Sequence, residues 1–230
     1  QPVKFYYDLL SQPCRALYMF LEASKIPYEP VVVKLRSGEH LTDEFRDNVN
    51  RFKKVPAIND HGFKLSESVA IFRYLVREKL VPDHWYPRDS LARAKVDEYL
   101  EWQHNNVRAH AALYFLRTFF LPTITNKPLS LDILKKCESN LNKCLDDFEE
   151  NWARQNKYLI GTKISFADLL AICEIDQPKY MGFDPFKGRP KLESWYNLVK
   201  DSMVPYYEEA SKDIQKVGKM AKAAKAQSQL

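Results

Sequence analysis

The sequence predicts a mixed fold class, with an α/β domain in residues 1–80 followed by an all-helical domain in residues 90–230. Runs of β-branched and aromatic residues, which are typical of strands, are dense near the start of the chain and nearly vanish after residue 89. Between the two regions, "VPDHWYPRD" (81–89) contains two prolines and no periodicity, which indicates a linker. A chain of 230 residues is long enough to bury two cores.

The first domain opens with a strand, helix, strand unit. "VKFYYDL" (3–9) and "EPVVVKL" (29–35) read as strands, and apolar residues recur at helical spacing in "CRALYMFLEASK" (14–25) between them. A short helical stretch follows at 40–49. "PAIND" and "FKLS" then flank "DHG", which predicts a hairpin in which Gly62 adopts a positive φ angle.

Helical patterns account for the rest of the chain. One at 67–79 completes the order βαβ-α-ββα, and beyond the linker long patterns cover 90–120, with a bend, and 129–155. In "KISFADLLAI", Ser165 and Asp168 have the spacing of a capping box, which predicts the start of a further helix. The second domain is therefore expected to be all-helical.

Composition and charge exclude several classes of protein. Hydrophobic residues make up 45% and charged residues 28%, the balance of a folded chain rather than a disordered one. The formal charge is +5. From Lys212 onward the chain contains five lysines and a single acidic residue, Asp213, a net charge of +4, so the rest of the chain carries +1. Because the basic residues form a tail rather than a face, we expect no nucleic-acid partner.

The sequence also predicts the compartment. No run of about 18 uncharged apolar residues occurs, and "QPVKFYYD" lacks the layout of a signal peptide, so we expect a cytoplasmic protein without stable membrane association. The cysteines are Cys14, Cys137, Cys144 and Cys173; they form no CxxC pair and no metal-ligand spacing with histidines. We therefore expect free thiols and no bound metal.

The basic tail from about residue 212 is weakly amphipathic. Ile214, Val217, Ala221 and Ala224 fall on one stripe, and the lysines lie mostly elsewhere. A solvated or frayed helix is the favoured interpretation, because chain termini are commonly mobile. A lid over an active site is the alternative, and membrane attachment is a weaker one because the stripe is mostly alanine.

The strand, helix, strand unit followed by a hairpin and helix is the thioredoxin-like layout, which carries its chemistry at the first strand-to-helix turn. In "DLLSQPCRAL" (8–17) the nucleophile position of thiol oxidoreductases holds Ser11, whose hydroxyl cannot open a disulfide. Cys14 lies one turn into the helix. It is either a buried, inert thiol or a redox-active one, and the sequence leaves both interpretations open. Ser11 is either an N-cap or a donor that stabilises the thiolate of a bound ligand.

Two further motifs favour a peptide-like ligand. In "KKVPAI" the Val55-Pro56 bond is a candidate for the cis form, which would expose the Val55 amide and carbonyl; a trans bond is the alternative. In "LSESVA" no capping box is completed, so the helix amides and Ser68 can receive an anion and Glu67 an ammonium group; ordinary serine capping is the alternative.

Two cationic side chains complete a possible set. His40 and Lys54 can hold a second carboxylate, although a solvated surface charge is the alternative for Lys54.

The chain resembles a theta-class glutathione transferase over residues 3–210. The resemblance rests on "DLLSQPCRALYMF", "GEHLTDEF", "KKVPAI", "LSESVAIFRYL", "PDHWYPRD", "ARAKVDEYLEWQH", "ISFADLLAICEI" and "FKGRPKLESW", which occur in the family's order and nearly its spacing. It implies a thioredoxin-like domain that binds glutathione, a helical domain that shapes the electrophile pocket and contributes to a homodimer, and glutathione as co-substrate with no permanently bound cofactor.

The resemblance also implies roles for single residues. Ser11 would hydrogen-bond the glutathione thiolate, and Arg108 would favour that thiolate by its charge. Phe115 and Phe119 are candidates for the electrophile pocket, with helix core as their alternative. The other residues assigned to glutathione binding are Gln12, His40, Lys54, Val55, Pro56, Glu67, Ser68 and Asn105.

One position departs from the family pattern. Asn105 stands where some theta enzymes have an acid that reaches glutathione across the dimer. The expected reaction is attack of the glutathione thiolate on electrophilic small molecules. A peroxide oxygen is a second expected acceptor. Two alternatives stay open: a non-catalytic carrier of apolar ligands, and a thiol oxidoreductase that uses Cys14.

Overall fold

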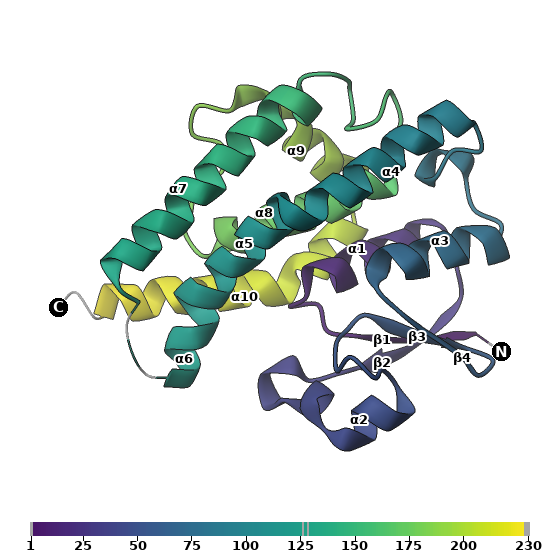
Figure 1. The fold of residues 1–230 in the computed structure, drawn as a ribbon, viewed down its shortest axis with the longest axis horizontal. Helices are drawn as coiled ribbons and strands as arrows, with labels where there is room; N and C mark the ends of the chain where they lie inside the picture. Colours follow the sequence, from purple (N-terminus) through teal and green to yellow (C-terminus); the bar gives the residue numbers. More distant parts are fainter. Residues whose placement is uncertain (1, 126, 128, 228–230) are drawn as a thin grey trace.

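A four-stranded mixed sheet forms the N-terminal domain of the structure, a computed structural model that describes residues 2–125, 127 and 129–227. The strands lie in the order β2-β1-β3-β4, with β1 parallel to β2 and antiparallel to β3, and β3 antiparallel to β4. Helices α1 and α3 lie on one side of the sheet and α2 on the other (Figure 1). The elements are β1 (Val3–Tyr7), α1 (Gln12–Ala23), β2 (Tyr28–Val32), α2 (Asp43–Asn48), β3 (Ala57–Asp60), β4 (Phe63–Ser66) and α3 (Ser68–Glu78). This order confirms the predicted βαβ-α-ββα layout.

Both predicted strands of the first unit end earlier than expected, and Asp8 explains why. Its carboxylate accepts hydrogen bonds from the amide of Leu10 at 2.8 Å and from the amide of Leu35 at 3.0 Å. A side chain that bonds the amide two residues ahead starts a turn instead of extending a strand. Asp8 thereby joins the turn after β1 to the turn after β2.

The segment 40–49 is a helix in only part of its length. A 3-10 turn covers Glu39–Leu41, and α2 begins after Thr42, whose backbone is extended and whose hydroxyl accepts a hydrogen bond from the amide of Phe45 at 3.2 Å. The hairpin prediction is confirmed, since Gly62 has φ +93° in the turn between β3 and β4.

The chain beyond Glu78 is helical apart from turns, in the part that the structure describes, with one isolated bridge between Tyr158 and Gly161. The predicted bend in 90–120 occurs at Asn106, where φ is −117° and ψ is −100°. The elements are the 3-10 turn Asp83–Trp85, α4 (Ser90–Asn105), α5 (Val107–Phe115), the π-helical turn Leu116–Phe120, α6 (Leu121–Thr125), α7 (Leu131–Phe148), the π-helical turn Glu149–Ala153, α8 (Phe166–Tyr180), α9 (Pro190–Ser202) and α10 (Tyr206–Gln227).

The two domains share one hydrophobic interface. Helix α1 packs against α8 and α10 of the helical domain. Phe20 of α1 and Phe72 of α3 lie edge to face at 5.0 Å, and the Phe72 ring stacks on Phe166 of α8 at 4.0 Å. Since all three rings are fully buried, the first helix is held in place largely by residues of the other domain.

Helix α8 is the buried axis of the helical domain. The capping box at its start is present, as predicted. The Asp168 carboxylate accepts hydrogen bonds from the amides of Ser165 at 2.8 Å and Leu159 at 2.9 Å, and from the indole N–H of Trp195 at 2.9 Å. One carboxylate therefore links the start of α8, the preceding loop and α9.

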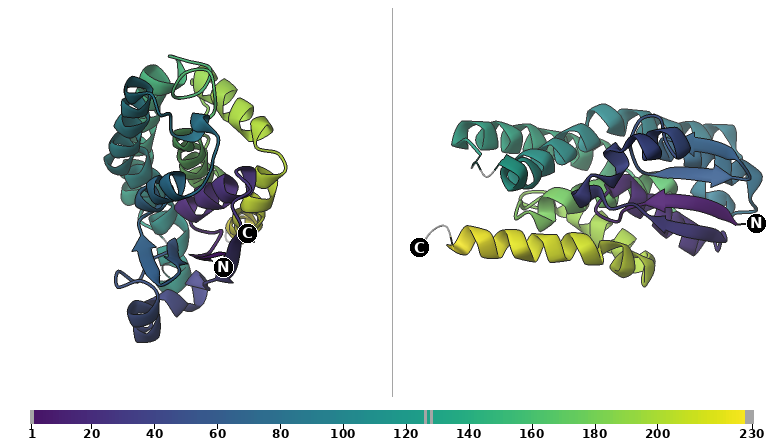
Figure 2. Two further views of the ribbon diagram at one scale, coloured as in Figure 1. Left: turned by 90° about the vertical axis from the view of Figure 1, so that its right-hand side faces the viewer. Right: turned by 90° about the horizontal axis from the view of Figure 1, so that it is seen from below.

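The prediction of a solvated or frayed tail from about residue 212 is wrong for the part of α10 that contains Ile214 and Val217. Ile214 and Val217 are buried, and a Cβ on Gly218 would lie 2.5 Å from the carbonyl oxygen of Tyr180, so only glycine allows this close crossing. Figure 2 shows α10 running along the long axis of the molecule beside the N-terminal domain. Lys219 and Lys222 are exposed, and the side chain of Ala224 lies outside the described residues.

Within the residues that the structure describes, none of the helices has the length and apolar character needed to cross a bilayer. The cysteines Cys14, Cys137, Cys144 and Cys173 are buried free thiols, as expected.

Asp168→Ala is expected to lower the free energy of unfolding by about 3 kcal/mol or more, because it leaves several buried donors without an acceptor. Chemical denaturation measures this change. The matched control, Asp201→Ala, removes an exposed carboxylate of the same domain and is expected to change stability by less than about 0.5 kcal/mol. Equal stability of the two variants would contradict the role assigned to Asp168.

Candidate active site

Ser11 occupies the N-cap position of α1, with an extended backbone of φ −83° and ψ 125°. In the described part of the chain its hydroxyl accepts no capping hydrogen bond from an α1 amide. Ser11 therefore stands at the N-cap position but does not cap the helix with its side chain. The hydroxyl is left available as a donor to a ligand at the mouth of the helix.

A pocket of about 470 Å³ opens beside Ser11 and joins the two domains. Phe115 and Phe119 of the helical domain line it together with Ser11 and Gln12, and the two rings lie 5.4 Å apart. The structure thus brings four of the predicted residues to one cavity. The pocket lining that the sequence reasoning missed comprises Leu10, Leu35, Arg36, Phe120, Thr123, Ile124 and Gln177.

The π-helical turn Leu116–Phe120 carries part of this wall. Phe119 lies within the turn and Phe115 immediately before it. Such turns are frequent at functional sites, because the extra residue changes which side chains face a cavity. The helical pattern predicted over 90–120 gave no signal for this turn.

A second, mainly apolar pocket of about 720 Å³ lies on the other side of the β1–α1 turn. It shares Leu10 and Arg36 with the Ser11 pocket, and Val217 and Met220 of α10 form part of its wall. Because none of the described α10 residues lines the Ser11 pocket, the lid alternative for the tail stays a prediction.

The Val55-Pro56 peptide bond is cis, as predicted from "KKVPAI". The preceding loop is anchored by Asn50, whose side-chain amide donates to the carbonyl of Lys54 at 2.7 Å. Lys54 itself is exposed and, among residues 2–125, 127 and 129–227, forms no ion pair. Its ammonium group is thus available to an anionic ligand.

His40 lies in the 3-10 turn after β2 and is half-buried. Burial lowers the pKa of its imidazole, against smaller raising effects of Asp8 and Glu39, which favours the neutral ring. Its buried Nδ1 atom has no hydrogen-bond partner among the described residues. A ligand that supplies such a partner would satisfy it.

Helix α3 begins without a side-chain cap, as the sequence predicted. Glu67 stands at the N-cap position with φ +69°, a left-handed conformation that costs a non-glycine residue about 1–3 kcal/mol. Within the described chain its side chain makes no capping bond, and Ser68 opens the helix. The first amides of α3 and the Ser68 hydroxyl are therefore free to hold an anion.

Arg108 does not line the Ser11 pocket. Its guanidinium donates to the carboxylate of Glu174 on α8 at 2.6 Å, and Glu174 is buried. Burial raises the pKa of Glu174, and the Arg108 charge opposes that rise. Asn105, the last residue of α4, is exposed.

The geometry counts against a redox role for Cys14. Its side chain is fully buried, and burial raises the pKa of the thiol to about 12, although the Ser11 hydroxyl lowers it to a smaller extent. A reactive cysteine needs an accessible thiolate near neutral pH. Cys14 is instead a small packing residue of α1.

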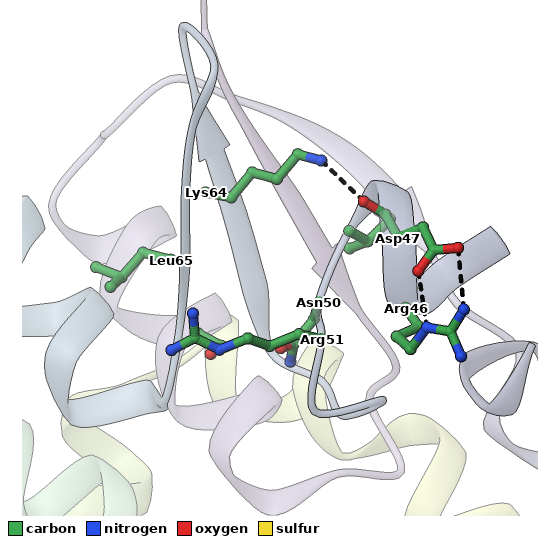
Figure 3. A pocket seen from close by; sticks show the side chains of 8 residues that line it. Arg46, Asp47, Asn50, Arg51, Lys64 and Leu65 are labelled. Atoms are coloured by element: carbon green, nitrogen blue, oxygen red, sulfur yellow. Dashed lines mark hydrogen bonds and ion pairs between the residues drawn. The ribbon is translucent and has the colours of Figure 1, made fainter. Parts of the chain in front are cut away.

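A third pocket, of about 250 Å³, is lined by charged side chains between α2 and β4 (Figure 3). Arg46 is paired with Asp47 at 2.7 Å, and the Lys64 ammonium donates to the Asp47 carbonyl at 3.4 Å. Because two of its three cations are engaged with neighbours and all are exposed, we assign no function to it.

Comparison with known proteins agrees with this geometry. Residues 3–77 match the family model of the glutathione S-transferase N-terminal domain, and residues 113–201 match that of the C-terminal domain. Over 198 residues the chain is 44% identical to glutathione S-transferase theta-1 of Bos taurus, an alignment that covers 86% of this chain and 82% of the relative. The chain belongs to the glutathione S-transferase family, and to its theta class. It is therefore a glutathione transferase.

Solved structures of theta-class transferases have the same fold. Human glutathione-S-transferase T1-1 in its apo form superposes with a TM-score of 0.90 at 41% identity, covering 94% of this chain and 91% of that one. A human theta-class glutathione transferase in complex with the glutathione conjugate of 1-menaphthyl sulfate superposes with a TM-score of 0.91 at 31% identity, covering 98% and 92%.

Treatment of the native protein with glutathione disulfide is expected to leave Cys14 unmodified, because its thiol is buried and protonated. Peptide mass spectrometry after quenching measures the modification, and the same treatment in denaturant provides the positive control. The variant Cys14→Ala is expected to keep conjugation turnover within about twofold. A stoichiometric mixed disulfide on Cys14 in the native protein would contradict this assignment.

Proposed function

We propose that this transferase holds the glutathione thiolate at the Ser11 hydroxyl and presents its sulfur to electrophiles bound against Phe115 and Phe119. The observation that carries the proposal is the position of Ser11, whose hydroxyl is free of capping at the wall of an aromatic pocket of about 470 Å³. An electrophilic carbon is the main acceptor, and a peroxide oxygen is a second one.

The chemistry follows from the thiol pKa. A free thiol titrates near pH 8.5, and a hydroxyl donor at a helix N-terminus stabilises the thiolate form. Each unit by which the pKa falls corresponds to about 1.4 kcal/mol. Holding the sulfur next to the bound electrophile contributes further acceleration, because the reaction becomes effectively unimolecular.

The remaining predicted residues fit the two ends of the tripeptide. Lys54, assisted by His40, receives the glycyl carboxylate, and Val55 before the cis Pro56 pairs with the cysteinyl backbone. The γ-glutamyl end docks at the start of α3, where Ser68 and the free amides take the carboxylate and Glu67 takes the ammonium group.

Three other assignments complete the glutathione site. Gln12 contributes to glutathione binding, and Asn105 reaches the ammonium group of the tripeptide across the proposed dimer. Arg108 favours the thiolate through its electrostatic field, which its ion pair with Glu174 weakens.

We assign residues 1–80 to the glutathione-binding domain, 81–89 to the linker and 90–230 to the helical domain that supplies the electrophile pocket and dimer contacts. A cytoplasmic homodimer is the proposed working state. Sedimentation at micromolar concentration tests the dimer, and a monomer under those conditions would contradict it.

Ser11→Ala is expected to lower conjugation turnover by at least about tenfold, since a hydrogen bond to a charged group contributes about 1.5–3 kcal/mol. Steady-state kinetics with glutathione and a reactive halide measure this. Stability is expected to be nearly unchanged, because the hydroxyl caps no amide in the described structure. Wild-type turnover in the variant would remove Ser11 from the mechanism, and an inactive wild-type protein would favour the carrier alternative.

Lys54→Met is expected to raise the Kd for glutathione about tenfold with a smaller change in turnover, because it removes an ion pair remote from the sulfur. Calorimetric titration with glutathione measures the affinity. Lys64→Met, which removes another exposed lysine of the same domain, serves as the matched control. Equal affinities of the two variants would exclude Lys54 from the site.

A further inference from the structure

The peptide group between Leu10 and Ser11 is held at both of its polar atoms. The amide of Ser11 donates to the backbone carbonyl of Asp8 at 2.9 Å. The carbonyl of Leu10 accepts two hydrogen bonds, from the Arg15 guanidinium at 3.3 Å and from the Gln177 side-chain amide at 3.0 Å. The plane of this peptide fixes the position of the Ser11 Cα atom, from which the hydroxyl side chain projects.

Arg15 is a fully buried cation directed at backbone carbonyls. It donates to the carbonyls of Leu9 at 3.0 Å and Cys173 at 2.8 Å, and to the side-chain oxygen of Gln177 at 2.7 Å. Among the described residues it has no carboxylate within ion-pair distance. Burial of a charge without a counter-ion is costly, so such an arrangement indicates a positional constraint beyond packing.

The charges around Arg15 lie further away. Asp8 on the turn uses its carboxylate for the amides of Leu10 and Leu35, and Glu174 on α8 is paired with Arg108. Burial raises the pKa of Asp176 on α8, and the charge of Arg15 opposes that rise.

Gln177 connects this arrangement to the helical domain. Its side chain is 1% exposed, bonds Arg15 through its oxygen and Leu10 through its nitrogen, and also lines the Ser11 pocket. It lies 162 residues from Arg15 in the sequence, on α8. One amide of the second domain thus joins the buried cation to the peptide that precedes Ser11.

We propose that Gln177 and Arg15 are positioning residues that orient the Ser11 hydroxyl toward the glutathione sulfur. Arg15 on α1 and Gln177 on α8 of the helical domain both donate to the Leu10 carbonyl. The seating of α8 on α1 is thereby coupled to the geometry of the thiolate donor. This inference rests on the role proposed for Ser11. Small displacements of an oriented donor can lower turnover strongly, which makes the effect of these two side chains measurable.

The test compares Gln177→Met with Gln103→Met in the full-length protein. Gln103 is also buried in the helical domain, but its amide donates to Leu100 on its own helix. Gln177→Met is expected to lower turnover at saturating glutathione about fivefold to tenfold and to raise the pKa of the bound thiol by about half a unit to one unit. The Kd for glutathione is expected to stay within about twofold, because the groups assigned to the tripeptide ends are untouched.

A second variant, Gln177→Glu, keeps the volume and the acceptor for Arg15 but removes the donor to Leu10. It is expected to shift turnover and thiol pKa in the same direction, and it keeps the test valid if Gln177→Met does not fold. The thiolate absorbance of bound glutathione, followed against pH, measures the pKa.

A double-mutant cycle with Ser11→Ala distinguishes positioning from general destabilisation. Because Gln177 acts through Ser11, Gln177→Met is expected to change turnover by less than about twofold in the Ser11→Ala background. An equal loss in both backgrounds would overturn the proposal, as would wild-type turnover and thiol pKa in both Gln177 variants. Wild-type turnover in Ser11→Ala alone would instead reject the role of Ser11 on which this inference rests.

Discussion

The packing of α1 on α8 is the constraint on which the site depends. Helix α1 carries Ser11 at its start, and one face of it is covered by residues of the helical domain, including Phe166, whose ring lies edge to face with Phe20 at 5.8 Å. A hydrogen-bond donor must be oriented within a few tenths of an ångström to stabilise a developing charge. The helical domain therefore supplies an apolar wall of the pocket and, through its contacts with α1, also fixes the position in space of the start of that helix.

Local sequence was sufficient for the parts of the site that depend on local backbone geometry. Ser11 at the first turn, the cis bond before Pro56 and the uncapped start of α3 were each predicted from the residues within a few positions of them. These features rest on rules for proline, for caps and for strand-to-helix turns, which act over a short stretch of chain. The overall layout followed from hydrophobic periodicity for the same reason.

Contacts between residues far apart in the chain left no such pattern in the local sequence. Gln177 lies in the buried stretch Phe166–Pro178 of α8, and no neighbour in the sequence marks it as a partner of Arg15. Arg108 was predicted to act on the thiolate, and its ion pair with Glu174 depends on the packing of α5 on α8. The segment around Ile214 and Val217 was predicted to be a solvated end because chain termini are commonly mobile, and its packing partners on other helices are far away in the sequence.

The crossing at Gly218 sets the distance between α10 and Tyr180 at the end of α8. Met220, one half-turn further on, forms part of the second pocket, so the width of that cavity depends on a residue that need not touch any ligand. A bulkier residue at position 218 would push α10 away from Tyr180 and widen the second pocket near Met220. Substrate range in such a chain can therefore diverge through changes at a helix crossing, while the catalytic groups and the pocket lining stay the same.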